Sequence, residues 1–501
     1  MNKHEQQQHG GANASMASPP GYEGIRLDDG LSGGIGRGER GDLEENGGGK
    51  LNLVRQAVHQ AREQDWFARV CDDPLAHAFN RKTVVHAGMS GKPVDKDRVA
   101  AVMNEMFDAP RTGKSTAYVH IPFCETHCLY CGFYTTAYRN EHSAPYTDAL
   151  LGELRAEQDR EAVRGAPIHA LYLGGGTPTA LAAADLKRLL LGLREYLPLA
   201  NDCEITVEGR VHGLSREKMA ACLEGGANRF SLGVQTFNTD IRRSMGRIGR
   251  RQDVIETLRT LQEFDAASIV IDLIFGLPGQ SMENWQEDLR TFDELELDGC
   301  DLYQLNIFPG GKLDKALKSG QAAPAADLAG QSRMFKLGVE YMTGRHMRRL
   351  SMSHWGRTPR ERNLYNPLMK SRANCLAYGA GGGGNLHGCF YFIQGNFEKY
   401  MAARKDGIKP VVMVMGVPDN LDMIRSLTSQ MEQGWLDLAR VTRDSGVDAH
   451  ELFAPLLSQW EEAGLLQCQN GQVELTLAGQ FWQMTMTQAL IDWHQHKTRG
   501  S

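Results

Sequence analysis

The chain has 501 residues, more than a single ordinary core holds, so we expect two or more domains. Hydrophobic residues make up 41% and charged residues 23%, and the net charge of −6 argues against bulk electrostatic binding of nucleic acid. No apolar run reaches the length of a membrane span, and the N-terminus lacks the apolar region of a secretory signal.

The first 115 residues divide into two parts. Residues 1–50 are rich in Gly, Gln, Asn and Glu and carry too few apolar side chains to offset the entropy of ordering, so they are predicted to be a disordered tail. Residues 51–115 are predicted to be a mostly helical segment, including Leu51–Val70 and Asp97–Phe107, with a Gly/Pro break at Gly88–Pro93.

From residue 116 to 325, short β-rich runs alternate with stretches of helical periodicity. This alternation predicts an α/β fold with a parallel sheet, an open (β/α)6 barrel whose ligands bind at the carboxyl ends of the strands. The predicted strands are Thr116–Ile121, His169–Leu173, Glu204–Glu208, Arg229–Val234, Ile269–Phe275 and Leu302–Ile307. The predicted helices are Ala144–Val163, Ala182–Tyr196, Ser215–Glu224, Gln252–Phe264 and Ser281–Leu295.

The alternation weakens after residue 325. Residues 326–415 are predicted to connect the domains and to form a substrate cleft, with a glycine-rich loop at 379–388 followed by the aromatic residues Phe390, Tyr391 and Phe392. Residues 416–501 are predicted to be a small helical domain of winged-helix type that ends with a β-like run at Val473–Leu477.

Three cysteines lie in one short loop, in the order Cys124, Cys128 and Cys131. A CxxxCxxC spacing brings three thiolates to one small cluster, and three ligands leave one iron of a [4Fe–4S] cube open to a substrate. This spacing is typical of radical S-adenosylmethionine (SAM) enzymes. Unrelated thiols or a zinc loop are the alternatives, although structural zinc wants a fourth ligand. The other seven cysteines show no paired spacing, which favours reduced thiols and a cytoplasmic location.

A second motif, Gly174–Thr179 (GGGTPT), follows the next predicted strand. Its glycines allow the backbone to approach a ligand closely, and the run lacks the Lys-Ser/Thr ending of a P-loop. By itself such a run is equally compatible with a tight turn. One β/α unit after the cysteine loop, it predicts a contact to the amino group of SAM.

Five strings, YVHIPFC, CLYC, LYLGGGTPT, FSLGVQTF and IDLIFGLPGQS, together resemble the oxygen-independent coproporphyrinogen III oxidase group of radical SAM enzymes, closely over about 116–310. The resemblance implies a [4Fe–4S] cluster and SAM, with a second SAM as a further possibility. It also implies a set of SAM-binding residues after successive strands: Tyr118, Tyr130, Phe133, Gly175, Gly176, Thr177, Glu208, Gln235, Arg247, Asp272 and Asn306.

Some of these residues carry more specific implied roles. Glu208 stands where the group has an acidic SAM ligand, Asp272 would suit a ribose hydroxyl, and Asn306 would contact adenine or a second SAM. The alternative for Asp272 is a carboxylate that caps the next turn. The alternative for Arg247, which lies among four other arginines, is a solvated basic face.

The chain departs from coproporphyrinogen oxidase at Phe133, where that enzyme carries a further cysteine. The segment Asp73–Lys82 with His86–Gly88, and the run Tyr378–Gly388, resemble instead the anaerobic haem-utilisation radical SAM methyltransferases. This resemblance implies haem as substrate and a low-potential, flavodoxin-like electron donor. A radical formed from one SAM would activate the methyl group of a second, and the resulting carbon radical would attack a bridging carbon, opening the ring and releasing iron.

Haem binding requires cations for the propionates and a cleft with aromatic walls. A basic segment could supply the cations, with a solvated loop as its alternative: Arg345, Arg348, Arg349, Arg357, Arg360 and Arg362. His354 is a candidate iron ligand, with a structural histidine as the favoured interpretation, and His86 and His387 are weaker candidates. The alternative functions are a haem chaperone without porphyrin chemistry and coproporphyrinogen III oxidase.

Overall fold

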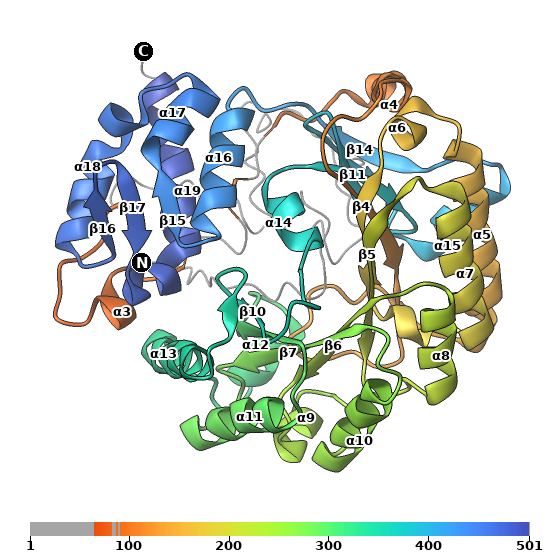
Figure 1. The fold of residues 1–501 in the computed structure, drawn as a ribbon, viewed down its shortest axis with the longest axis horizontal. Coiled ribbons are helices and arrows are strands. Elements are labelled where there is room, and N and C mark those ends of the chain that lie inside the picture. Colours follow the sequence, from red (N-terminus) through yellow and green to blue (C-terminus); the bar gives the residue numbers. More distant parts are fainter. Residues whose placement is uncertain (1–64, 83–86, 89–90, 500–501) are drawn as a thin grey trace.

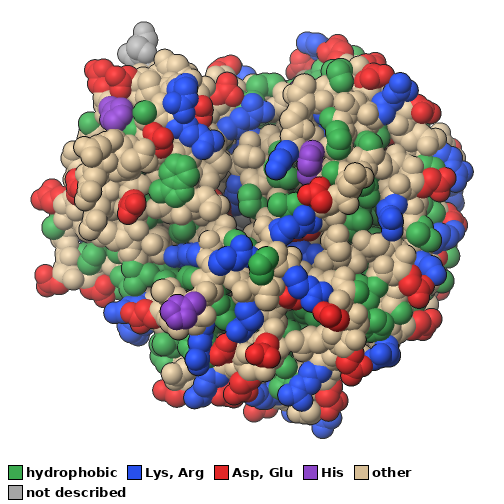
Figure 2. Space-filling view, in the orientation of Figure 1, with side chains coloured by type: hydrophobic (Ala, Val, Ile, Leu, Met, Phe, Trp, Pro, Cys, Tyr) green, Lys and Arg blue, Asp and Glu red, His purple; other side chains and the backbone are tan. Residues whose placement is uncertain are grey.

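The computed structural model describes residues 65–82, 87–88 and 91–499. A curved sheet of 12 strands runs through the larger part of the molecule, in the order β14-β13-β12-β11-β1-β4-β5-β6-β7-β8-β10-β9. Figure 1 shows helices along the outer side of this sheet and a separate, mainly helical domain at the other end of the long axis. Over the face drawn in Figure 2, basic and acidic side chains are interspersed.

The predicted open (β/α)6 barrel is confirmed. All six expected strands form and pair in parallel, and their buried side chains meet the outer helices in one core. The strands are β1 (Ser115–Ile121), β4 (Ile168–Gly175), β5 (Leu199–Arg210), β6 (Arg229–Gln235), β7 (Ser268–Phe275) and β8 (Gly299–Gln304). The helices are α5 (Ser143–Glu157), α6 (Glu161–Arg164), α7 (Ala183–Tyr196), α8 (Arg216–Glu224), α9 (Thr239–Ser244), α10 (Arg251–Gln262) and α11 (Met282–Glu294).

Short elements complete the barrel. The cysteine loop lies between β2 (Phe123–Cys124) and β3 (Thr136–Ala137), which pair with each other. The 3-10 helices are η3 (Lys96–Arg98), η4 (Asn140–His142) and η5 (Pro178–Ala180), and α4 (Val99–Asp108) precedes β1.

Residues 326–415 extend the sheet at both ends. β11 pairs in parallel with the far side of β1, and the glycine run leads from β11 into β12. The aromatic side chains of β13 are buried and pack against other parts of the protein on both faces of the sheet: Phe390, Tyr391 and Phe392. The elements are α12 (Lys312–Lys318), α13 (Leu328–Gly344), β9 (Arg348–Arg349), β10 (His354–Gly356), α14 (Tyr365–Lys370), β11 (Asn374–Tyr378), β12 (Gly383–Leu386), β13 (Cys389–Ile393), α15 (Phe397–Lys405) and β14 (Val411–Met415).

The C-terminal region is mainly helical, as expected, and it also holds a three-stranded sheet. The β-like run is strand β17, but it does not end the domain, because a 23-residue helix follows it. The elements are α16 (Leu421–Met431), β15 (Trp435–Asp437), α17 (Leu438–Ser445), α18 (Ala449–Glu462), β16 (Leu466–Gln469), β17 (Gln472–Leu475) and α19 (Leu477–Arg499). None of the helices in the described ranges has the length and apolar character needed to cross a bilayer.

The N-terminal segment packs on the C-terminal domain. The expected tail 1–50 and most of the expected helix Leu51–Val70 lie outside the described residues. The described part of that helix, 65–70, is not α-helical, because the backbone of Ala68 exchanges hydrogen bonds with the side chain of Gln459 instead. Trp66 and the four-residue α3 (Pro74–His77) join the domain's core, where the indole of Trp482 donates to Pro74 O.

Candidate active site at the carboxyl ends of the strands

The cysteine loop is tied down at both ends. β2 carries Cys124, and the N–H of Tyr138 after β3 donates to Cys124 O over 3.0 Å. Between these strands, the N–H of Leu129 donates to Met245 O over 3.1 Å, which fixes the part of the loop that holds Cys128. The loop therefore lies over the carboxyl ends of β1 and β6.

The glycine turn packs against this loop. Gly176 N–H donates to Ile121 O over 2.7 Å, and a Cβ at Gly176 would lie 2.5 Å from Phe123 O. Gly175 has a φ of +109°, and a Cβ there would lie 2.4 Å from the ring of His120. Only glycine fits both places. The turn brings the hydroxyl of Thr177 within 3.3 Å of Cys124 Sγ.

Glu208 closes the other side of the glycine turn. Its carboxylate, near the end of β5, accepts from Gly175 N–H over 3.3 Å and lies against Gly174. The side chain is 4% exposed. A carboxylate and a bare glycine backbone thus face the same small volume, an arrangement that fits an ammonium group.

A second group of predicted residues surrounds Gly233 on β6. Arg247 donates to Gly233 O, to the hydroxyl of Tyr130 over 2.9 Å and to Cys128 Sγ over 3.4 Å. A Cβ at Gly233 would lie 2.8 Å from Gln235 Nε2 and 3.8 Å from Asp272 Oδ2. The structure therefore places Arg247 in the site, and the solvated-face interpretation of this arginine is wrong.

Arg210 belongs to the site but was missed in the sequence. It is the last residue of β5 and donates to the hydroxyl of Thr126 over 2.7 Å, while its Nε and Nη2 are buried without a partner in the described chain. With Thr177 and Arg247 it lines a small cavity beside the cysteine loop. The signal was available, because residues two apart on a strand share a face and Arg210 follows Glu208 by two.

The two arginines set the electrostatics of the thiols. Burial alone would raise the pKa of Cys128, but Arg247 and Arg210 outweigh it and lower that pKa. Burial raises the pKa of Cys131 to about 12, and burial also raises the pKa of Cys124 against the opposing effect of Arg210. Metal ligation requires thiolates, so loading the loop releases protons.

The site fits a four-iron cluster with SAM better than a single metal ion. Within the described ranges, no three His, Cys, Asp or Glu side chains converge closely enough to hold one ion. Ligands of separate irons in a cluster lie farther apart than ligands of one ion. Buried polar atoms at the carboxyl ends of the strands are also available to bind a ligand. Gln235 Oε1 and both amide atoms of Asn306 have no hydrogen-bond partner in the described chain.

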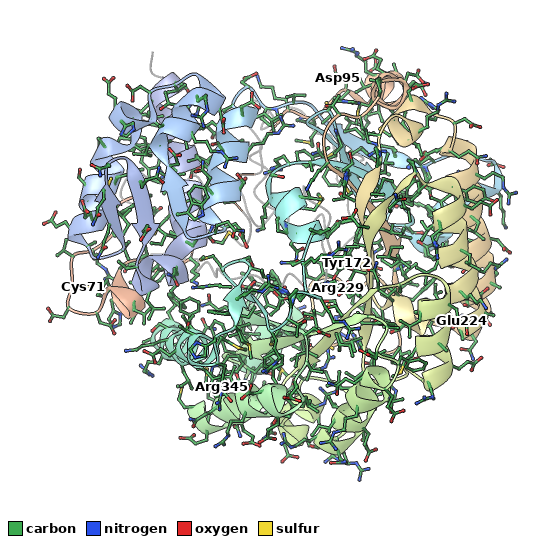
Figure 3. All side chains as sticks on the ribbon, in the orientation of Figure 1. Cys71, Asp95, Tyr172, Glu224, Arg229 and Arg345 are labelled. Atoms are coloured by element: carbon green, nitrogen blue, oxygen red, sulfur yellow. The ribbon has the colours of Figure 1, made fainter. Side chains whose placement is uncertain are left out.

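The structure does not bring every predicted SAM contact to the cysteine loop. Tyr118 lies mid-strand in β1, where its hydroxyl lies 3.0 Å from His120 Nδ1 and its ring stacks on Tyr172. Asp272 also lies mid-strand, in β7, rather than at a strand end. Phe133, by contrast, lies within the loop, and its N–H donates to Cys131 Sγ over 3.4 Å. Figure 3 shows Tyr172 and Arg229 inside the curve of the sheet, and Glu224 and Arg345 outside it.

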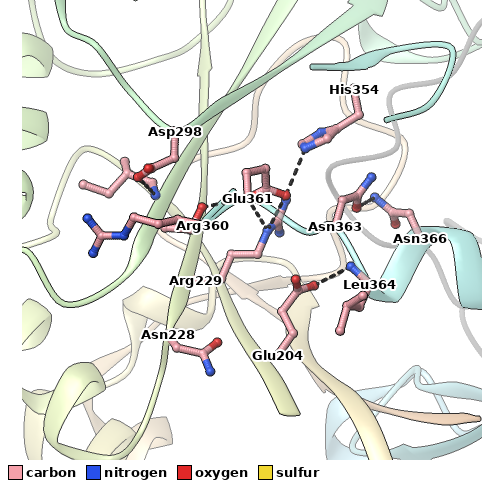
Figure 4. A network of polar contacts seen from close by, with 12 residues as sticks. Glu204, Asn228, Arg229, Asp298, His354, Arg360, Glu361, Asn363, Leu364 and Asn366 are labelled. Atoms are coloured by element: carbon pink, nitrogen blue, oxygen red, sulfur yellow. Dashed lines mark hydrogen bonds and ion pairs between the residues drawn. The ribbon is translucent and has the colours of Figure 1, made fainter. Parts of the chain in front are cut away.

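The favoured interpretation of His354 is supported. The side chain is fully buried, and its Nε2 lies 3.0 Å from Glu361 (Figure 4). Its Nδ1 lies 2.7 Å from Asp301, so both ring nitrogens are engaged. Glu361 also accepts from Arg229 near the amino ends of β6 and β7. This network lies at the opposite end of the strands from the cysteine loop and leaves neither ring nitrogen of His354 free to ligate iron.

The arginines of the basic segment 345–362 form ion pairs with carboxylates of the chain or hydrogen bonds with its backbone carbonyls. Arg345 and Arg357 pair with Asp293, and Arg360 and Arg362 lie within 4 Å of Asp265 and Asp202. The other two, Arg348 and Arg349, donate to backbone carbonyls: Thr358, Glu361, Ser351 and Met352. His387 lies in the turn from β12 to β13, and His86 falls outside the described residues. A propionate-binding role for the segment has no support in this geometry.

Comparison with known proteins assigns the barrel. Residues 118–292 match the radical SAM superfamily model. Anaerobilin synthase from Escherichia coli O157:H7 is 42% identical over 402 residues, which cover 79% of this chain and 88% of that protein. The haem chaperone HemW from Bacillus subtilis is 29% identical over 276 residues, 54% of this chain and 71% of the chaperone.

A solved structure agrees on the fold. Coproporphyrinogen III oxidase (HemN) from Escherichia coli superposes with a TM-score of 0.67 at 22% identity, over 78% of this chain and 93% of that one. At this identity the likeness concerns the fold alone. The likeness extends over more of the chain than the six-stranded barrel alone, since it covers 78% of this chain.

Proposed function

Since the chain belongs to the radical SAM family that includes anaerobilin synthase, we propose that it opens the porphyrin ring of haem without oxygen, using SAM. The observation that carries this proposal is the extent of the similarity, 88% of anaerobilin synthase, which exceeds the shared barrel. The chain is a radical SAM enzyme, and the family implies a [4Fe–4S] cluster and SAM.

The chain's own residues have distinct parts in this proposal. Cys124, Cys128 and Cys131 would ligate three irons, and the open fourth iron would supply the electron that cleaves SAM. Glu208 and the carbonyl groups of the glycine turn would accept hydrogen bonds from the SAM ammonium. Arg247 would hold the SAM carboxylate, because its guanidinium already lies 3.4 Å from Cys128 Sγ.

We further propose that a second SAM donates the methyl group that is added to the porphyrin. Support comes from Asn306, two residues beyond the end of β8, whose buried amide has no partner among the described residues. A buried amide without partners is unfavourable in the ligand-free protein, and an adenine edge would satisfy both of its atoms.

The proposed reductant is a flavodoxin-like protein, and the proposed compartment is the cytoplasm. Support for a reducing compartment comes from the cysteines, since all ten are free thiols, including those far from the loop such as Cys71 and Cys222.

The test uses the full-length protein with its cluster reconstituted anaerobically, haem, SAM with a deuterated methyl group, and a strong chemical reductant. Loss of the Soret band with a linear tetrapyrrole that carries the label is expected. The Cys124→Ala variant should lose the cluster and all SAM cleavage, while Cys71→Ala, which removes an exposed thiol, should retain both.

Two other outcomes would replace the proposal. Haem that stays bound with an intact Soret band under the same conditions would establish the chaperone alternative. Release of carbon dioxide from coproporphyrinogen III, with haem left unchanged, would establish the oxidase alternative.

A further inference from the structure

Lys82 is a buried cation at the carboxyl end of the barrel that sequence reasoning left without a role. Its ammonium donates to the side chain of Gln304, the last residue of β8, and to Phe481 O of α19 over 2.6 Å. It also lies 3.7 Å from the centre of the Phe481 ring. Three parts of the chain therefore meet at this side chain, which is 5% exposed.

Every group that faces Lys82 from the described part of the chain is uncharged. Gln304 comes from β8, its own partner Gln331 from α13, and Phe481 and Trp482 from α19. No carboxylate in the described ranges lies within ion-pair distance of Lys82. Burial therefore acts unopposed and lowers the pKa of this lysine to about 7.

Lys409 provides the contrast within the same chain. It is also largely buried, but its ammonium lies 2.9 Å from Glu157 and 3.2 Å from Glu153. Burial alone would lower its pKa, and the two carboxylates outweigh burial and raise it. The chain thus provides counter-charges for a lysine whose task is structural, whereas at Lys82 the negative charge is missing.

The position of Lys82 indicates where that charge comes from. Gln304 ends β8 at the same edge of the sheet as Gly175 on β4 and Gln235 on β6, and Asn306 lies two residues beyond it. Ligands of such barrels bind at this edge. Burial does not exclude ligand contact, because Glu208 and Gln235 are buried to the same degree.

We propose that Lys82 binds a carboxylate arm of the substrate. The proposal rests on the proposed function, because haem and related tetrapyrroles carry propionates on an otherwise apolar ring. The third N–H of the ammonium would donate to the carboxylate, and the ion pair would form in a site already removed from water. Such charge-assisted hydrogen bonds are strong when both partners are fixed.

The test compares haem with haem dimethyl ester, whose propionates carry no charge, in anaerobic binding titrations of the holoenzyme. Lys82→Met should weaken haem binding by about 10- to 100-fold and leave ester binding unchanged. Lys82→Arg keeps the charge and should bind haem more tightly than Lys82→Met does. Lys187→Met, at an exposed ion pair with Glu224, is the matched control and should bind both ligands like the wild type.

The pH dependence provides a second readout. With a free ammonium of pKa about 7, haem binding above that value requires proton uptake, so affinity should fall nearly tenfold between pH 7.5 and 8.5. The ester shares haem's iron chemistry but lacks the carboxylates, so it should not show this fall.

Two results would overturn the proposal without touching the proposed function. One is an equal loss of affinity for haem and its ester in Lys82→Met, which would make the lysine structural. The other is the same pH dependence for both ligands. In either case, the wild type would still open the ring of haem, which is measured separately.

Discussion

Replacing Glu361 by Gln tests how the amino end of the barrel is stabilised. Glu361 is fully buried, and its two oxygens share the N–H of Arg229 Nε. It also accepts from Ser268 and lies 3.0 Å from His354 Nε2 (Figure 4). The amide has nearly the same shape but no charge. In the variant, the buried cations Arg229 and His354 therefore face a neutral amide.

The expected loss of stability follows from this geometry. Removing one partner of a buried ion pair costs about 3–5 kcal/mol, because the remaining charge stays desolvated. At about 2–4 °C per kcal/mol for a domain of about 200 residues, Tm should fall by about 6–20 °C. The matched control is Asp265→Asn, which removes the same charge from an exposed pair with Arg360 and should change stability by less than about 1 kcal/mol.

The raised pKa of His354 predicts the direction in which the stability of the protein changes with pH. Burial would lower the pKa of His354, but Asp301 and Glu361 outweigh it and raise the pKa to about 9. A pKa raised above the unfolded value of 6.5 stabilises the fold fully below pH 6.5, and this contribution is lost as pH rises through 9. The difference amounts to about 3 kcal/mol.

The assay is anaerobic denaturant unfolding at several pH values, with cluster content measured in parallel. In Glu361→Gln, His354 keeps one of its two carboxylates, so the loss of stability between pH 6.5 and 9 should shrink. Unfolding of the variant like the wild type at pH 7, or a wild type that gains stability toward pH 9, would refute the reasoning.

Three further predictions concern the carboxyl end of the barrel. Gly175→Ala forces a Cβ against His120 at a φ of +109°, which costs about 1–3 kcal/mol locally, so SAM affinity should fall by equilibrium binding while iron content stays unchanged. Arg210→Met removes a cation beside the thiols, so the midpoint potential of the cluster should shift negative in a redox titration; an unchanged potential would contradict this. Asn306→Ala removes no side-chain hydrogen bond to the described residues and should not lower Tm, but it should lower label transfer to the porphyrin relative to 5′-deoxyadenosine formation.

Local periodicity was sufficient for the six barrel strands. Each is a buried run between helices, and a run such as Ser268–Phe275 is recognisable without knowledge of its neighbours. β11 was not predicted as a strand, since its pairing joins Asn374 to Ser115 across 259 positions and no local pattern encodes that contact. The helix predicted over residues 65–70 is wrong for the same reason, because the side chain of Gln459, distant in sequence, accepts from the backbone N–H of Ala68.

The same distinction between local and distant information applies to the residues of the candidate site. The cysteine spacing and glycine turn are local, so residues such as Cys124 and Gly175 were found from the sequence. The role of a charged side chain depends on what faces it. Arg247 and Arg360 both lie in arginine-rich stretches of the sequence, which does not distinguish them. In the structure, Arg247 donates to Cys128 Sγ, whereas Arg360 pairs with the exposed Asp265.

Cations at the carboxyl end of the barrel predict how ligands affect stability. At the amino end, Arg229 is matched by Glu361, so its charge is balanced without any ligand. At the carboxyl end, Arg210, Arg247 and Lys82 form no ion pair with a carboxylate in the described chain. Buried charges without partners destabilise a fold, so the thiolates, the carboxylate of SAM and the arms of the substrate complete an arrangement that is unbalanced without them. Each ligand should therefore raise Tm by binding the native state alone, and the rise with haem should exceed that with its dimethyl ester at equal concentration.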